Sequence, residues 1–226
     1  MTALEVRDVS FSHAHGRRRS LALATTHLEL AAGATLAVVG RSGAGKSTLA
    51  EIVLGLRRPA TGVVRVLGHL WTDPRHGPRR AHRRLVQGVP QDAAASFVPR
   101  VPVGTQISDA VRRLCRTTAS DARARTGDAA RLARLDAALL GRRPGELSGG
   151  QAQRAAIARA VALGPAVIVA DEPTSALDAE TTADVAASLL ALAPARRTAL
   201  LIVTHDPDLA ARCDARIEIV KAVDPA

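Results

Sequence analysis

Aromatic side chains are scarce in this chain of 226 residues, which contains two Phe, one Trp and no Tyr. Hydrophobic residues nevertheless make up 47% of it, so the chain can bury a core built from Ala, Leu and Val. The scarcity of rings argues against a protein that binds single-stranded nucleic acid by stacking bases on aromatic side chains. The apolar content argues against disorder along the whole length.

Cysteine and long apolar runs are also scarce. Cys115 and Cys213 are the only cysteines and form no CxxC motif, so we expect free thiols in a reducing compartment. No apolar run approaches the ~20 residues that a membrane-spanning helix needs. The first residues, MTALEVRDVSFS, lack the apolar segment of a signal peptide. These absences predict a soluble cytoplasmic chain.

Lysine is rare too, because Lys46 and Lys221 are the only two, and arginine supplies most of the formal net charge of +10. The densest basic segment is RHGPRRAHRR at residues 75–84, whose Pro and Gly predict an exposed loop. Such a surface is typical of proteins that bind nucleic acid or acidic membranes. It is also typical of an ordinary solvated surface in an arginine-biased proteome, and this is the favoured interpretation.

Apolar patterning indicates a mixed fold. Residues 3–36 alternate between apolar and polar side chains, as half-buried strands do, and GVVRVLG at residues 62–68 predicts a further strand. Residues 106–140 change to a helical pattern. AVIVA at 166–170 and ALLIV at 199–203 are continuous apolar runs, which predict buried parallel strands. We therefore expect an α/β fold with an antiparallel N-terminal part and an inserted helical lobe.

The strongest motif is GRSGAGKST at residues 40–48, which follows the predicted strand TLAVV and begins a helix near Lys46. It fits G-x-x-x-x-G-K-[ST], in which glycines allow backbone N–H groups to surround phosphates. Lys46 adds a charge at the outer phosphates, and the Ser47 hydroxyl suits Mg²⁺. The predicted phosphate-binding residues are Gly40, Ser42, Gly43, Ala44, Gly45, Lys46, Ser47 and Thr48.

Three weaker signals follow the predicted strands. Asp171 and Glu172 end the run VIVA; Asp171 suits a Mg²⁺ ligand and Glu172 suits a base that polarises water, although an acidic pair here is also typical of a helix N-cap. His205 follows ALLIVT and can donate to a terminal phosphate, whereas a lone His in that place is more often structural. Gln91 can bind Mg²⁺ or orient water through its amide.

A second anion-type site is predicted at ELSGGQAQR, residues 146–154. A Ser cap, two glycines and the first turn of a helix leave free backbone N–H groups that point at whatever lies ahead. One chain therefore has two separate phosphate-type loops.

The order of these motifs resembles the nucleotide-binding subunits of ABC transporters over nearly the whole chain. In that family GRSGAGKST is the Walker A loop, Gln91 the Q-loop residue, LSGGQ the signature, VIVADE Walker B, SALD (Ser175–Asp178) the D-loop and His205 the switch histidine. The resemblance implies a P-loop NTPase fold, an ATPase, and ATP and Mg²⁺ as its ligands. It implies one domain over residues 1–226, with a RecA-like core at about 1–90 and 160–226 and a helical lobe at about 92–158.

The resemblance also implies roles for individual residues. Two such domains pack head to tail around two ATP molecules, so the signature of one subunit contacts the ATP on the other. His13 falls where the family has an aromatic ring that stacks on adenine, although a His13 that points into solvent is an equally good interpretation. The implied catalytic residues are Glu172, His205 and Gln91, the metal ligands Ser47, Gln91 and Asp171, and the further ATP contacts Ser148, Gly149, Gly150, Gln151 and Asp178.

Within the family, the segments VPQDAAASFVP, ELSGGQAQRAAIARA and ADEPTSALD look most like the dipeptide, oligopeptide and nickel uptake branch. That likeness implies solute import at the cytoplasmic face of the membrane. The implied partners are integral-membrane permease subunits, a second ABC ATPase subunit (a paralogue or another copy) and, indirectly, an extracytoplasmic solute-binding protein.

Two alternatives to import remain open: the ATPase of an exporter, and an ABC ATPase that acts on nucleic acid. The sequence contains neither the coiled-coil insertion nor the tandem cassette of the second group, so no nucleic-acid partner is expected. We expect residues 91–103, including Phe97, to meet the permease, with ordinary packing of the helical lobe as the alternative.

Overall fold

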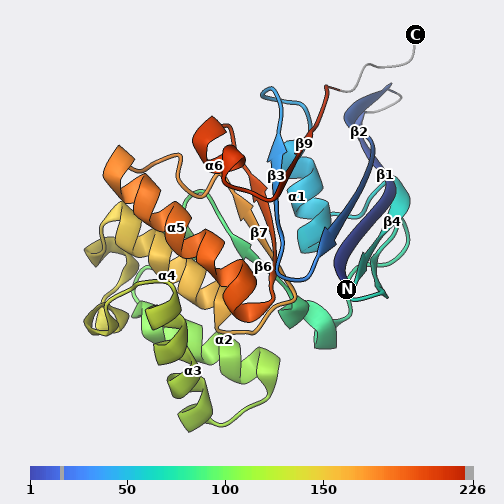
Figure 1. Ribbon diagram of the computed structural model, residues 1–226. Coiled ribbons are helices and arrows are strands. Elements are labelled where there is room, and N and C mark those ends of the chain that lie inside the picture. The colour runs from blue at the N-terminus through green and yellow to red at the C-terminus, as the bar shows by residue number, and fades with distance from the viewer. Residues whose placement is uncertain (16–17, 222–226) are drawn as a thin grey trace.

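Two β-sheets lie side by side in the computed structural model, which describes residues 1–15 and 18–221 (Figure 1). The first sheet is antiparallel, with the strand order β2-β1-β4-β5. Its strands are β1 (Thr2–His15), β2 (Arg18–Ala31), β4 (Thr61–Val66) and β5 (His69–Thr72).

The second sheet is parallel throughout, with the order β6-β7-β8-β3-β9. Its strands are β3 (Thr35–Val39), β6 (Val86–Val89), β7 (Val167–Asp171), β8 (Ala199–Val203) and β9 (Ala215–Glu218).

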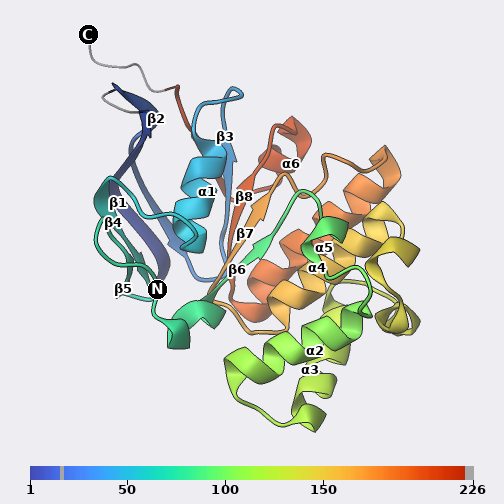
Figure 2. The ribbon, with the colours of Figure 1, turned by 180° about the vertical axis from the view of Figure 1, so that it is seen from behind.

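Helices cover both faces of the parallel sheet (Figures 1 and 2). Helix α1 lies between the two sheets, α4 and α5 lie on the other face, and α2 and α3 form the lower end of the molecule in both views. The helices are α1 (Lys46–Leu54), α2 (Val103–Cys115), α3 (Ala119–Leu132), α4 (Gly149–Val161), α5 (Ala179–Arg196) and α6 (Pro207–Ala211). Short 3-10 helices are η1 (Arg80–Leu85), η2 (Ala94–Ser96), η3 (Ala137–Gly141) and η4 (Pro144–Glu146).

Strand β8 explains why the continuous apolar runs form the middle of the parallel sheet. Leu200 and Ile202 belong to the buried cluster under α4 and α5, whereas Leu201 and Val203 belong to the cluster on the α1 side. Because both faces are covered, the strand has no polar face, which is typical of a central parallel strand. The strands predicted at 35–39 and 199–203 form with those bounds, and the predicted α/β architecture is confirmed.

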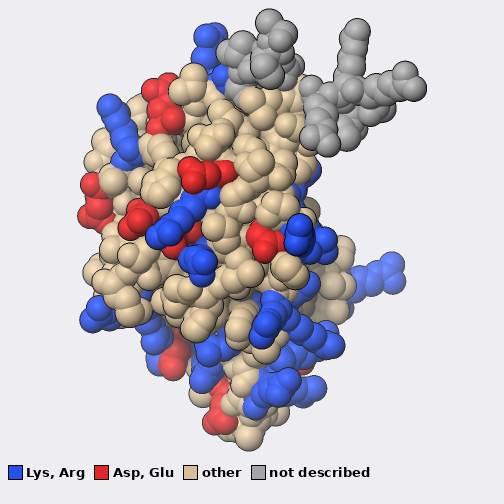
Figure 3. All heavy atoms as spheres, turned by 90° about the vertical axis from the view of Figure 1, so that its right-hand side faces the viewer, with Lys and Arg blue, Asp and Glu red and all other residues tan. Residues whose placement is uncertain are grey.

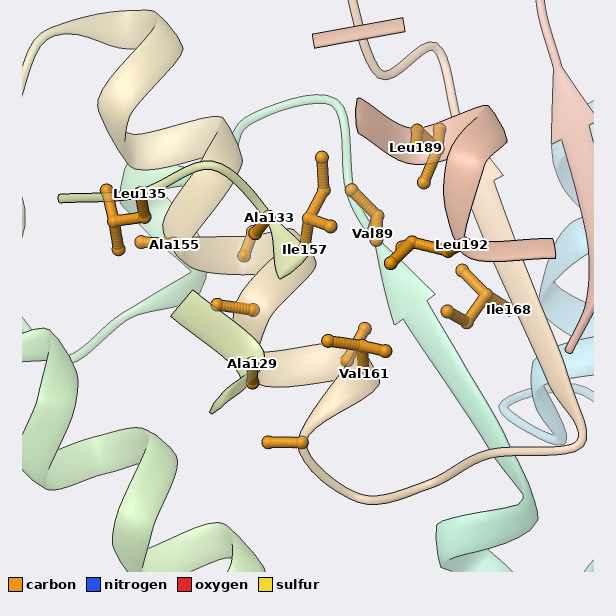
Figure 4. Packing of buried hydrophobic residues seen from close by; sticks show 14 of the residues in the cluster. Val89, Ala129, Ala133, Leu135, Ala155, Ile157, Val161, Ile168, Leu189 and Leu192 are labelled. Atoms are coloured by element: carbon orange, nitrogen blue, oxygen red, sulfur yellow. The ribbon is translucent and has the colours of Figure 1, made fainter. Parts of the chain in front are cut away.

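The buried cluster under α4 and α5 continues into the helical lobe (Figure 4). Ala129 of α3 packs in the same cluster as Ile157 of α4 and Ile168 of β7. Because one buried cluster includes residues of both parts, the division of residues 1–226 into a RecA-like core and a helical lobe stays a prediction. Among the described helices, none combines the length and the apolarity that a bilayer span requires.

Two loop predictions have specific outcomes. Residues 75–84 are largely exposed, as predicted, but the second half of the segment forms η1, since no Gly or Pro follows Pro78 until Gly88.

Phe97 is only 4% exposed, and the guanidinium of Arg159 lies 4.4 Å from its ring centroid. The expectation that Phe97 contacts a permease is therefore corrected: its ring is part of the internal packing.

Candidate functional site

The carboxyl ends of four adjacent parallel strands bring the main predicted residues to one edge of the sheet. In the spatial order β6-β7-β8-β3, these ends lead to Gln91, to Asp171 with Glu172, to His205, and to the loop at residues 40–48. Ligands of open α/β sheets bind at this edge, because loops and helix N-termini converge there. Residues separated by more than 150 positions thus share one site.

The loop at residues 40–48 needs glycine because other segments approach its backbone closely. Gly40 has φ +142°, and a Cβ added to it would lie 2.3 Å from the Ile219 carbonyl oxygen. Gly45 has φ +105°, and a Cβ there would lie 2.4 Å from the Ala22 carbonyl oxygen. These contacts hold the loop between the end of β9 and the hairpin strand β2, so any larger residue would displace it.

The start of α1 has the features expected of a phosphate-binding site. Gly45 is the N-cap residue and lends no side chain to the first turn, so the helix begins with free backbone N–H groups and the positive end of its dipole. Nζ of Lys46 donates to the Gly40 carbonyl at 2.8 Å and to the Arg41 carbonyl at 3.1 Å. The lysine therefore lies over the loop, and phosphate binding by these residues stays a prediction.

Asp171 lies at the end of β7 facing this loop. Burial raises the pKa of its carboxyl group, a hydrogen bond from Ser47 lowers it, and the charges of Glu172 and Glu51 raise it again. Oδ1 of Asp171 is buried and has no hydrogen-bond partner among the described residues. A buried carboxylate oxygen without a donor is costly unless a cation neutralises it, so the donor set fits Mg²⁺.

Glu172 and His205 form a direct pair. Oε2 of Glu172 lies 2.7 Å from Nδ1 of His205, and it accepts a longer hydrogen bond of 3.4 Å from the His205 backbone N–H. Glu172 has φ +47°, an unusual value for a residue other than glycine. Its backbone N–H donates to the Val203 carbonyl at 2.9 Å, which fixes this turn onto β8. The imidazole is 68% exposed, so it borders open space in front of the sheet.

Gln91 is exposed after β6 and lines a groove of about 470 Å³ together with Asp171. Arg159 of α4 lines the same groove and donates to the carbonyl oxygen of Ser96 at 2.7 Å and to its Oγ at 3.0 Å. Burial lowers the pKa of the Arg159 guanidinium. Sequence reasoning missed Arg159, because no local feature of AAIARAVAL distinguishes it from the other arginines.

The signature residues lie at the start of α4, far from the loop at 40–48. Oγ of Ser148 accepts from the Gln151 backbone N–H at 3.3 Å, and Oε1 of Gln151 accepts from the Ser148 N–H at 3.0 Å, a reciprocal capping box. A Cβ on Gly150 would lie 2.3 Å from Cγ2 of Thr181, so glycine allows α4 and α5 to meet. In Figure 1 this end of α4 is at the left edge, whereas the loop before α1 is at the top.

Asp178 and His13 lie on two further elements, the N-terminus of α5 and strand β1. Oδ1 of Asp178 caps α5 by accepting from the Thr181 N–H at 2.9 Å, a bond that lowers the pKa of this carboxyl group. His13 is exposed on β1, with its ring centroid 5.2 Å from that of Phe11 in an edge-to-face arrangement. Their contacts with a nucleotide stay predictions, as do those of Gly149.

A glycine-rich loop between a central parallel strand and a helix, with a carboxylate at the end of a strand in the same sheet, defines a P-loop NTPase. A family model described as "ABC transporter" matches residues 23–175. The chain belongs to the ABC transporter family, as an ATP-binding subunit with ATPase activity. The prediction from the order of the motifs is confirmed.

Known proteins similar to this chain include nickel transport subunits. The nickel import ATP-binding protein NikE of Shigella dysenteriae serotype 1 (strain Sd197) is 36% identical over 225 residues, covering 97% of this chain and 84% of NikE. NikE of Escherichia coli (strain K12) gives the same identity and coverage.

Solved structures share the fold. The dimeric post-hydrolysis state of the ATP-binding cassette MJ0796, bound to ADP and Pi, matches with a TM-score of 0.85 at 27% identity, over 96% of this chain and 94% of the other. CbiO1 from Clostridium perfringens, part of the ABC transporter complex cbiONQ, matches with a TM-score of 0.83 over 97% and 85%. At 23% identity, the second likeness supports the fold alone.

Proposed function

We propose that the chain powers solute import, of the nickel or the dipeptide and oligopeptide type, by ATP-driven closure of two cassettes at the cytoplasmic face of the membrane. The relatives named as nickel import subunits support the import branch. The proposal of closure rests on one observation: the chain has two helix starts suited to phosphate, at α1 and at α4, and they lie on separate parts of the molecule (Figure 1).

The two helix starts are complementary halves of a nucleotide site. Free N–H groups at the start of α1 suit the phosphates from one side, and Ser148 with Gly149 at the start of α4 are exposed and suit the outer phosphate from the other side. Because one chain keeps these halves apart, a second subunit must supply the missing half. A monomer should therefore hydrolyse ATP slowly.

Mixing two variants that each lack one half tests this assembly. Lys46→Ala and Ser148→Arg should each be nearly inactive alone. If two copies form the pair, their mixture should recover about a quarter of wild-type turnover, since half of the dimers are mixed and each has one intact site of two. A mixture that dimerises with ATP but recovers no turnover contradicts the composite site.

Within each site, Ser47, Gln91 and Asp171 would hold Mg²⁺. The ion would neutralise charge on the phosphate oxygens. Two observations support this assignment: Oδ1 of Asp171 is buried without a hydrogen-bond donor, and the Asp171 carboxyl group is hydrogen-bonded to Ser47. Glu172 would polarise the attacking water, and His205, which touches its carboxylate, would orient it and donate to the terminal phosphate.

The groove beside Gln91 is the proposed contact with the permease. Leu56 lines it and is 77% exposed, and Val98 on the neighbouring loop is 58% exposed, so apolar side chains there are open to a partner. Val98→Glu should uncouple transport while ATP binding and folding stay unchanged. Phe97→Glu is the contrasting variant, because a charge at that buried position should destabilise the fold. Normal transport by Val98→Glu would contradict the docking site.

Identification of co-purifying proteins tests the import assignment itself. The tagged chain, recovered from gently solubilised membranes of its own cell, should bring two multi-span permease subunits and an ATPase, either a paralogue or a second copy. The permease would then indicate the solute. Recovery of only ribosomes, nucleic acid or soluble chains would overturn the transporter proposal.

A further inference from the structure

None of the residues assigned above to ATP binding or hydrolysis belongs to the arginine-rich segment at residues 75–84. No Asp or Glu occurs between Asp73 and Asp92. Five arginines in this segment are exposed, and within residues 1–15 and 18–221 no ion pair joins any of them to a carboxylate. We call these five the basic cluster: Arg75, Arg79, Arg80, Arg83 and Arg84. Unpaired cations at this density attract polyanions.

A cavity of about 450 Å³ adjoins the basic cluster and has three imidazoles in its wall. His69, His76 and His82 line this cavity together with Arg79 and Leu70. Nδ1 of His76 lies 3.0 Å from Oδ2 of Asp73, so that contact engages one ring nitrogen and leaves the other for a ligand. Figure 3 shows Lys and Arg side chains gathered over the lower half of the face that looks to the right in Figure 1.

Three imidazoles around one cavity also occur in metal sites, but the charges and distances here favour an anion. The ring centroids of His69 and His82 are 6.4 Å apart, whereas two imidazoles on one tetrahedral ion would be about 5 Å apart. No group of three His, Cys, Asp or Glu among the described residues has the arrangement of a metal site. Arg79 in the cavity wall would repel a cation and attract a phosphate.

We propose that the basic cluster and its cavity bind the headgroups of anionic phospholipids at the membrane surface. Guanidinium and imidazole groups would donate to the phosphate oxygens. Leu70, 46% exposed in the same cavity wall, would face the acyl boundary. A surface that combines unpaired arginines with an exposed leucine suits a lipid interface.

Nucleic acid fits the same surface less well, because the cavity wall offers only imidazoles, whose stacking face is small, and the buried indole of Trp71. Trp71 is the only tryptophan of the chain and is 3% exposed. Its indole N–H donates to the Val53 carbonyl at 2.8 Å, so the ring is held inside.

The position of the basic cluster agrees with a membrane partner, and this point rests on the proposed function. Pro78 and Arg83 line the groove that we assign to the permease, so the cluster lies directly beside it. A subunit docked there would bring the five guanidinium groups towards the lipid around the permease. Lipid binding would then add to the permease contact in holding the ATPase at the membrane.

Flotation of the purified full chain with large unilamellar vesicles tests the inference. One set contains phosphatidylcholine alone and the other about one third phosphatidylglycerol. We expect binding to the anionic set only, weakened by added salt. Arg79→Gln with Arg80→Gln should lower the partition coefficient about 25-fold, at about fivefold per arginine. Arg142→Gln with Arg143→Gln removes the same charge at another exposed site and should change it less than about twofold.

Several results would overturn the inference. Equal losses from both arginine pairs would make the effect one of net charge alone. Equal binding to both vesicle sets would exclude headgroup recognition, and tighter binding to a short RNA duplex at the same salt would assign the surface to nucleic acid. ATP hydrolysis is measured in parallel: a chain that hydrolyses ATP normally but never floats refutes lipid binding and leaves the proposed ATPase function standing.

Discussion

Oε2 of Glu172 lies 2.7 Å from Nδ1 of His205, although the two residues are 33 positions apart in the sequence. The pair forms because β7 and β8 are neighbours and Glu172 turns back onto β8 through its bond to the Val203 carbonyl. Glu172 is the less exposed partner, with 17% of its side chain accessible against 68% for the imidazole. A carboxylate held in this way is pre-oriented before any substrate arrives.

Glu172→Gln should abolish turnover while ATP binding persists. The amide keeps the shape of the side chain but cannot accept a proton from water, so we expect kcat to fall about 10²- to 10⁴-fold. Because ATP is no longer consumed, the variant should also accumulate as an ATP-bound dimer, which light scattering after size exclusion would detect. Glu180→Gln, an exposed position in the first turn of α5, is the control and should behave like the wild type. Near-normal turnover in Glu172→Gln would assign the base elsewhere.

Local patterns predicted the elements and the phosphate loop because these depend on neighbouring residues. The apolar run ALLIV forms β8 over Ala199–Val203, and the helix expected near Lys46 begins there, after a glycine with φ +105°. Periodicity and turn chemistry suffice for such features. The placement of the motifs at the carboxyl ends of the parallel strands was predictable for the same reason, since each motif directly follows a predicted strand.

Contacts between distant segments were not predictable from local patterns. Arg159 donates to Ser96, 63 residues earlier, and its guanidinium lies over the buried Phe97 ring. Nothing in the loop SFVPRVP separates the buried Phe97 from the exposed Val98 that follows it. The same limit applies to Gly150, whose need for glycine arises from Thr181 on another helix.

Arg159→Met should loosen the connection between α4 and the loop after β6. The variant loses two hydrogen bonds from a charged donor to Ser96, so we expect the free energy of unfolding to fall by about 1.5–3 kcal/mol in urea. Arg159→Lys should recover only part of this loss, because an ammonium cannot make both bonds in one plane over the Phe97 ring.

A double-mutant cycle with Ser96→Ala separates the bond to the Ser96 hydroxyl from the stacking on Phe97. The bond to Oγ should give a coupling energy of about 0.5–1.5 kcal/mol, while the bond to the backbone carbonyl survives in Ser96→Ala. Additive effects of the two substitutions would show that the hydroxyl contact contributes nothing to stability.

Asp171→Asn should stabilise the nucleotide-free chain at neutral pH while it removes Mg²⁺-dependent ATP binding. The folded chain has a raised Asp171 pKa, so ionisation of this buried group costs stability once the pH exceeds its unfolded pKa of about 3.8, and the full cost remains above the folded pKa. The amide avoids that cost, and we expect Tm to rise by roughly a few degrees at pH 7.

The gain from Asp171→Asn should shrink as the pH falls through the folded pKa, because the wild-type carboxyl group then becomes neutral too. Thermal melts of both chains across the acid range check this, and Asp208→Asn, at an exposed position in α6, serves as the control. A Tm difference for Asp171→Asn that does not vary with pH would mean that burial of the charge is not its cause.

His13→Tyr should tighten ATP binding if this position stacks on adenine. The ring of His13 is exposed at a centroid distance of 5.2 Å from Phe11, and on the paired strand β2, Ala22 and Leu23 approach Gly45 of the phosphate loop. A phenol ring offers a larger stacking face than an imidazole, worth about 0.5–1.5 kcal/mol, so we expect the Kd for ATP to fall about two- to tenfold. His27→Tyr, exposed on β2, should leave the Kd unchanged. Inorganic triphosphate, which has no base, makes the test specific: if its affinity rises as much as that of ATP, the gain does not come from stacking. An unchanged Kd for ATP would support the interpretation in which His13 points into solvent.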